Sequence, residues 1–142
     1  MSATQYTTIE TKLLALIDGI TEIQQVYGYR KGDLNGFPAC CLEGFSSVSD
    51  FRSQTVTERT MVFNFRVYQE AVKDGVGAAE AESRINTIID KLLNAFDTDW
   101  TLTTSADSSL ITRMAKEWVQ DTNFMRVLEF DVTVKKLYDL NT

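Results

Sequence analysis

The segment TERTMVFNFRVY, residues 57–68, alternates two kinds of side chain with great regularity. Successive side chains of a β-strand point to opposite faces of the sheet, so such a segment predicts a strand with two unlike faces. One face carries Arg59, Met61, Phe63, Phe65 and Val67. The other carries Glu58, Thr60, Val62, Asn64, Arg66 and Tyr68. We therefore expect a sheet with one face in the core and a second, largely polar face turned to water, to a ligand or to another copy of the chain.

Three further segments have the pattern of strands. Residues 126–138, RVLEFDVTVKKLY, alternate as strongly as residues 57–68. The spacing in residues 110–120 fits either a helix or a strand, and we interpret it as a strand because a strand after a short polar turn usually pairs with the segment before it. Residues 37–45, FPACCLEGF, hold the only proline near their start, where a strand tolerates it. We expect this strand to pair with residues 57–68 in an antiparallel hairpin with a long polar connection.

Two segments have the spacing of amphipathic helices. Thr7 and Glu10 have the spacing of a capping box, and apolar residues then recur at threes and fours through residues 8–27. Residues 78–96 show the same period after a glycine-containing break. The glycine-rich residues 28–36 predict a loop. The sequence thus predicts one α+β domain spanning residues 1–142, in the order α-β-β-α-β-β. Its antiparallel sheet of about four strands has both helices packed on one face.

The composition argues against several classes of partner. The net charge is −6 and no run of lysine or arginine exceeds two residues, which argues against binding nucleic acid by neutralising phosphates. No apolar run is long enough to cross a bilayer, and the first residues lack a secretion signal, so we expect a protein of the cytoplasm with no membrane partner. Cys40 and Cys41 are the only cysteines, and we interpret them as packed thiols.

Catalytic patterns are weak. The chain has no histidine, which excludes Ser–His and Cys–His chemistry. Asp97 and Asp99 form the most suggestive carboxylate pair, but a calcium loop would need a glycine near Leu102 and a glutamate near Ser108. We expect no enzyme, no cofactor and no metal. A small carboxylate enzyme that uses a divalent metal is a rival hypothesis.

The candidate functional residues lie on the polar sheet face and beside the element ends. On the face, charged and aromatic side chains either meet water or form half of a self-complementary interface. These are Arg66, Tyr68, Glu129, Asp131 and Lys135. Large aromatics near element ends either cover the core or insert into a neighbouring subunit. These are Phe37, Phe45, Phe51, Trp100 and Phe124.

The order of these segments resembles that of the small α+β proteins in the neck of tailed bacteriophages, above all the tail terminator or tail completion family. Three features carry the resemblance over residues 8–138. The first is an N-terminal helix followed by a glycine-rich loop into GFPACCLEG. The second is a polar loop, TERTMVFNFRVY and the helix AEAESRINTIIDKLLNAFDTD. The third is the terminal strand RVLEFDVTVKKLY.

The resemblance implies a structural protein of the virion, assembled in the host cytoplasm. Proteins of this family form a homo-oligomeric ring, commonly of six subunits, which caps the tail tube, offers the head a docking surface and lets DNA pass without binding it. The tail tube protein and the head–tail connector proteins would be its partners. On this hypothesis the five residues of the polar face are subunit contacts. Residues 44–57 and 99–109 would be loops that contact these partners through Phe45, Phe51, Trp100 and Phe124. Another connector or tube-like protein, or a cytoplasmic protein-binding adaptor, is the alternative.

Overall fold

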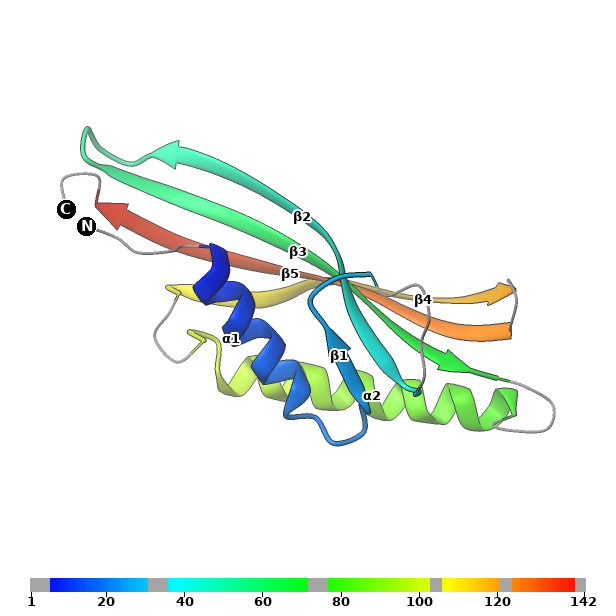
Figure 1. The fold of residues 1–142 in the computed structure, drawn as a ribbon. Helices are drawn as coiled ribbons and strands as arrows, with labels where there is room; N and C mark the ends of the chain where they lie inside the picture. Colours follow the sequence, from blue (N-terminus) through cyan, green and yellow to red (C-terminus); the bar gives the residue numbers. More distant parts are fainter. Residues whose placement is uncertain (1–5, 31–35, 72–76, 103–105, 121–123, 140–142) are drawn as a thin grey trace.

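A computed structural model describes residues 6–30, 36–71, 77–102, 106–120 and 124–139 of the chain. Two helices and five strands follow one another along it. They are α1 (Tyr6–Asp18), β1 (Gln25–Tyr27), β2 (Ala39–Phe51), β3 (Val56–Glu70), α2 (Ala78–Thr98), β4 (Ser108–Gln120) and β5 (Phe124–Asp139). The strands form one long twisted sheet, and both helices lie on the same face of it (Figure 1). The predicted α+β class and the two helices on one face are confirmed.

The sheet has the order β1-β2-β3-β5-β4 and is mixed. β1 pairs with β2 in parallel, and every other pair is antiparallel. The prediction of four antiparallel strands is therefore wrong in its detail, because residues 25–27, assigned to the first helix, form the additional strand β1. The strand predicted at residues 110–120 is confirmed by β4.

The first helix is shorter than the predicted span of residues 8–27. α1 ends at Asp18, and Gly19 follows, a residue that costs about 1 kcal/mol in a helix interior relative to alanine. Ile20 and Ile23 nonetheless stay buried, in turns whose backbone bonds run from Ile20 N to Ile17 O and from Ile23 N to Ile20 O. Their helix-like spacing is thus produced by successive turns. Its start also differs from the predicted capping box, since α1 already includes Tyr6, whose hydroxyl donates to Glu10 at 2.7 Å.

The β2–β3 hairpin is confirmed, but its long connection is wrong. β2 continues to Phe51, which lies opposite Thr57 of β3. The backbone N–H groups of Arg52 and Ser53 both donate to the carbonyl of Val56, at 2.8 and 3.2 Å, and close a tight turn. The serine-rich residues after Phe45 have little strand signal of their own. Pairing with the strongly alternating β3 holds them in the sheet.

The core lies between the helices and the predicted face of β3. Phe63, Phe65 and Val67 are fully buried, and the ring of Phe65 stacks on Phe130 of β5 with 5.2 Å between centroids. Both helices direct isoleucine and leucine side chains onto this face, which is the packing that their apolar stripes predict. These are Ile9, Leu13, Ile17, Ile85, Ile88 and Leu92. None of the helices among the described residues is long and apolar enough to cross a membrane.

Ion pairs fix α2 against the sheet. Glu82, in the second turn of α2, accepts hydrogen bonds from Lys116 of β4 and from Arg126 of β5. These bonds, led by that from Arg126, lower the pKa of the Glu82 carboxyl. Helix and sheet are thereby joined by charge at one end and by apolar packing along their length.

Candidate functional site: the uncovered face and edges of the sheet

The face of the sheet opposite the helices carries a network of charged and polar side chains. Glu129 of β5 lies at its centre and accepts hydrogen bonds from Arg113 at 2.8 Å, Arg66 at 3.2 Å and Asn64 at 3.4 Å. Asp131 accepts a second bond from Asn64 at 2.7 Å. We call this network the charged cluster. Its members are Glu43, Asn64, Arg66, Tyr68, Arg113, Glu129 and Asp131.

The register of the strands places these side chains side by side. Asn64 lies opposite Asp131, Arg66 lies opposite Glu129, and Arg113 lies opposite Asp131 on the other side of β5. Opposite charges directly across an antiparallel pair each contribute some tenths of a kcal/mol. The cluster therefore orders a polar surface across four neighbouring strands, β2, β3, β5 and β4.

Hydrogen bonding shifts the pKa values in the cluster. The bond from Arg113, followed by those from Arg66 and Asn64, holds the pKa of Glu129 below its usual range despite partial burial. The hydroxyl of Tyr68 donates to Glu43, and burial together with this carboxylate raises the pKa of Tyr68. At neutral pH the Glu129 carboxyl is thus ionised and Tyr68 keeps its proton.

Four of the five predicted contact residues meet in this cluster. Arg66, Glu129 and Asp131 belong to it directly, and Tyr68 joins it through Glu43. Lys135 lies farther along β5, opposite Thr60 and Ser108, and is exposed. Whether they contact a neighbouring subunit stays a prediction.

Three members of the cluster were not among the predicted contact residues: Asn64, which was placed on this face, and Glu43 and Arg113, which were not. Glu43 falls at a register shift between Leu42 and Gly44, and Arg113 follows a similar shift in β4. A β-bulge breaks the two-residue alternation from which face assignments are made. The available signal was that the predicted strands at residues 37–45 and 110–120 contain a glutamate and an arginine, respectively.

Beyond the charged cluster, toward the β2–β3 turn, the same face carries exposed apolar side chains among polar ones. Val48 is 68% exposed, Leu110 is 56% exposed and Leu137 is 49% exposed. Val48 lies opposite Thr60 and Leu110 lies opposite Thr133, so both belong to the face away from the helices. We call Val48, Val62, Leu110 and Leu137 the apolar strip. Exposed apolar side chains on an uncovered sheet face are candidates for contact with another protein.

Both edges of the sheet are open along most of their length. Among the described residues no strand pairs with the outer side of β4, and β1 covers β2 only from Ala39 to Cys41. An edge strand presents unpaired N–H and C=O groups to another chain. The two open edges lie on opposite sides of one sheet, as Figure 1 shows for β2 and β4.

The four aromatic residues predicted to contact partners are scattered. Phe45 lies within β2, so its assignment to a loop at residues 44–57 is wrong; its ring contacts Phe63 at 5.0 Å between centroids. Phe51 ends β2 and is 73% exposed, and Trp100 follows α2 and is 54% exposed. Phe124 begins β5 and is half-buried against Trp118.

The loops predicted as contact segments are also shorter than expected. Of residues 44–57, only the turn at 52–55 lies between β2 and β3. Of residues 99–109, the last two belong to β4, and residues 103–105 lie outside the described part of the chain, as do residues 31–35 of the predicted glycine-rich loop. Phe51 and Trp100 are the exposed aromatics that remain beside turns.

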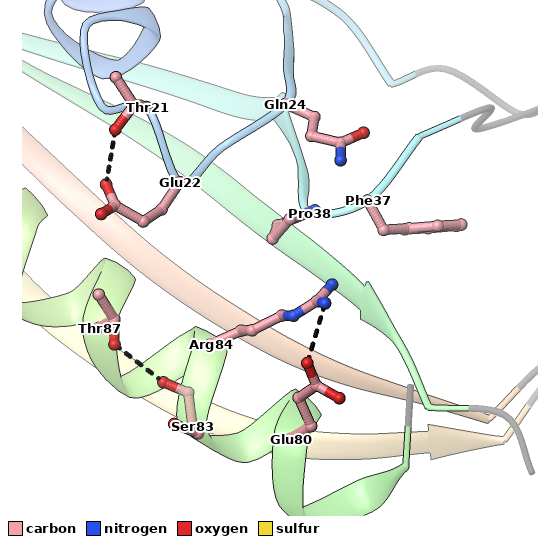
Figure 2. Close-up of a pocket in the computed structure, with 9 residues that line it drawn as sticks. All are labelled: Thr21, Glu22, Gln24, Phe37, Pro38, Glu80, Ser83, Arg84 and Thr87. Carbon is pink, nitrogen blue, oxygen red and sulfur yellow. Dashed lines mark hydrogen bonds and ion pairs between the residues drawn. The ribbon is translucent and has the colours of Figure 1, made fainter. Parts of the chain in front are cut away.

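A pocket of about 410 Å³ lies on the helix side of the molecule, between the segment after α1 and the first half of α2 (Figure 2). Arg84 and Glu80, both from α2, form an ion pair of 3.0 Å at its rim, while Thr21 donates to Glu22 on the opposite wall. Because Arg84 is already paired, the pocket offers no free positive charge to a substrate. The hydroxyl of Thr21 does meet a carboxylate in Glu22, but at 3.2 Å and between exposed neighbours in the chain.

The acidic pair from the sequence lies at the end of α2 and outside any cluster of metal-ligating residues in the described part of the chain. Asp97 is exposed near the end of α2 and Asp99 is half-buried just after it. In the ranges that the structure describes, no group of three or more histidine, cysteine, aspartate or glutamate residues could hold a metal ion. Cys40 and Cys41 are both buried, and burial raises the pKa of the Cys40 thiol.

No family model matches the chain, and no curated protein matches it. The uncovered sheet face and the open edges are therefore the features from which a function is argued.

Proposed function

We propose that this chain is a structural protein of the bacteriophage neck, which assembles into a ring on the end of the tail tube. The observation that carries the proposal is the pair of open edges on opposite sides of one sheet. A contact between two different surfaces, repeated from copy to copy about an axis, closes a ring. The β4 side of one subunit and the β2 side of the next are two such surfaces.

Strand direction supports this contact. β2 is antiparallel to β3, β3 to β5 and β5 to β4, so β4 runs antiparallel to β2 within one subunit. When the sheet of one copy continues into the next, β4 therefore meets β2 in the antiparallel sense, the slightly more stable pairing. Among the described residues, the part of β2 that follows Cys41 has no partner strand on its outer side. This part can therefore pair with β4 of the next copy.

The uncovered face supplies the rest of the proposed interface. Arg66, Tyr68, Glu129 and Asp131 form a pre-ordered polar surface, and Lys135 lies beyond it beside the apolar strip. An interface with an apolar centre and a polar rim is the usual anatomy of protein contacts. These five residues are the proposed subunit contacts.

Charge supports a channel that DNA crosses without binding. The chain has a net charge of −6, and within the charged cluster the carboxylates of Glu43, Glu129 and Asp131 outnumber the guanidinium groups of Arg66 and Arg113. Like charges repel, so a ring of such subunits would not hold the phosphate backbone. The head-docking and tube-capping faces would be formed by the turns, with Phe51 and Trp100 as the exposed anchors.

The proposal is tested by electron microscopy of the purified chain at high concentration in negative stain. Closed rings with a central hole are expected. Val48→Asp places a charge in the apolar strip and should abolish them, whereas Thr87→Asp, on the exposed side of α2, should leave them intact. The proposal fails if no rings form, or if both variants behave like the unmodified chain.

A further inference from the structure

Among the described residues, the outer edge of β4 is unpaired over one segment, and the residue at the centre of that segment is Ala115. At its start, the N–H of Ser109 donates to the carbonyl of Trp100 at 2.6 Å, so the outer edge there is already used. From Leu110 to Gln120 no described strand pairs with that edge. Ala115 lies at the midpoint of this open segment, and its small side chain is exposed on the uncovered face.

Two copies of this edge can pair with each other only in certain registers. A two-fold axis perpendicular to the sheet keeps each side chain on its own face, so a residue pairs with one that lies an even number of positions away. With the axis at Ala115, Arg113 of each copy lies opposite Glu117 of the other. With the axis at Lys116, two lysines would oppose each other. With the axis at Met114, Arg113 would face Ala115. The register centred on Ala115 alone creates two opposite-charge pairs.

The side chains are already disposed for this register. Arg113 is held on the uncovered face by Glu129 at 2.8 Å, and its side chain remains 51% exposed. Glu117 is exposed on the same strand and has no ion-pair partner among the described residues. The charge pattern of the open segment is thus self-complementary about Ala115.

We infer that in dilute solution the free chain is a dimer in which two β4 strands pair antiparallel about Ala115. This pairing joins two five-stranded sheets into one continuous sheet. It also uses the edge that the ring contact would need, so dimer and ring exclude each other. That second consequence rests on the proposed function, whereas the dimer itself does not.

A cysteine at the centre of the strand tests the pairing. Directly opposite residues of an antiparallel pair have Cα atoms about 4.5–5.5 Å apart, within the span of a disulfide. Ala115→Cys should therefore form a covalent dimer almost completely on mild oxidation, as seen by non-reducing electrophoresis and intact mass. Gln120→Cys, exposed near the end of the same strand, should stay monomeric because its symmetry mate lies far away. Absence of a covalent dimer with Ala115→Cys overturns the inference, as does equal cross-linking of both variants.

Charge exchange tests the register. Glu117→Arg turns two attractive pairs into repulsive ones and should raise the dimer dissociation constant on the order of tenfold, measured by sedimentation. Adding Arg113→Glu restores opposite charges across the axis, so the double variant should dimerise more tightly than Glu117→Arg alone. An effect of Glu117→Arg that the second substitution fails to reverse would contradict this register.

The exclusion of dimer and ring has its own test. Oxidised Ala115→Cys should remain a dimer at concentrations at which the unmodified chain forms rings, and a reducing agent should restore ring formation. Rings that form from the locked dimer would overturn the exclusion. Covalent dimers without rings from the unmodified chain would refute the proposed function while leaving the dimer in place.

Discussion

Replacing Phe65 by alanine should remove a large part of the stability of the fold. Phe65 is fully buried in the middle of β3, between the helices and the sheet, and its ring stacks on Phe130 at 5.2 Å. Truncation of a buried phenylalanine to alanine costs about 3–5 kcal/mol. A stacked aromatic pair is worth about 0.5–1.5 kcal/mol beyond the buried area, which places Phe65→Ala in the upper part of that range, at about 4–5 kcal/mol.

This cost converts into a melting shift that is easy to measure. A chain of 142 residues unfolds with an entropy of about 0.3 kcal/mol per kelvin near 60 °C, so 4–5 kcal/mol corresponds to a fall in Tm of about 13–17 °C. Circular dichroism during heating and in urea measures the Tm and the free energy of unfolding. Phe51→Ala is the matched control, because Phe51 is 73% exposed and should cost less than about 0.5 kcal/mol. A loss below about 1 kcal/mol for Phe65→Ala, or equal losses in both variants, would refute the assignment of the core face.

Three further predictions concern the uncovered face and the acidic pair. Tyr68→Ala should cost far less stability than Phe65→Ala while weakening self-association, measured by melting and sedimentation; a full loss of folding would contradict its place on the uncovered face. The pKa of Glu129 lies below its ordinary value of 4.5, so its contribution to stability is present above pH 4.5 and is lost as the pH falls through the lowered pKa. Glu129→Gln should therefore reduce the fall in the free energy of unfolding between pH 7 and pH 3. If the variant loses as much stability over this range as the original chain, the bonds to Arg113 do not contribute as described. Mg²⁺ or Ca²⁺ should leave the Tm unchanged in both the original chain and Asp97→Ala; a metal-dependent rise that Asp97→Ala abolishes would revive the metal-enzyme hypothesis.

Strong local patterns were sufficient to predict much of the fold. β3 and β5 alternate along their length, and α2 keeps a helical period from Ala81 to Phe96, so each could be located from the residues alone. In each of these elements one face is buried against the rest of the chain, and local pattern and tertiary packing therefore favour the same structure. The faces assigned to Phe65 and Arg66 are those that the structure shows.

Elements determined by their neighbours could not be predicted. β1 has three residues and exists through its pairing with β2, while its sequence continues an apolar helical period. The second half of β2 is rich in serine and is held in the sheet by β3. In both places tertiary hydrogen bonding outweighs a weak local preference.

Local pattern likewise predicted one part of the candidate site, and strand pairing determined the rest. Alternation placed Arg66, Tyr68, Glu129 and Asp131 on one face, but it could not reveal that bulges bring Glu43 and Arg113 into their network. A register shift depends on how two strands pair, and the sequence of either strand does not encode it by itself. The open edges likewise became visible only when the order of the strands was known.

Native mass spectrometry over a wide range of protein concentration tests the central claim most directly. If the chain assembles by a head-to-tail contact across its two open edges, the largest abundant species at high concentration should be a closed ring with the mass of six copies of the 16.0 kDa chain. The dimer should be the main species at low concentration. A monomer or dimer that persists as the endpoint up to the highest soluble concentration would contradict the ring.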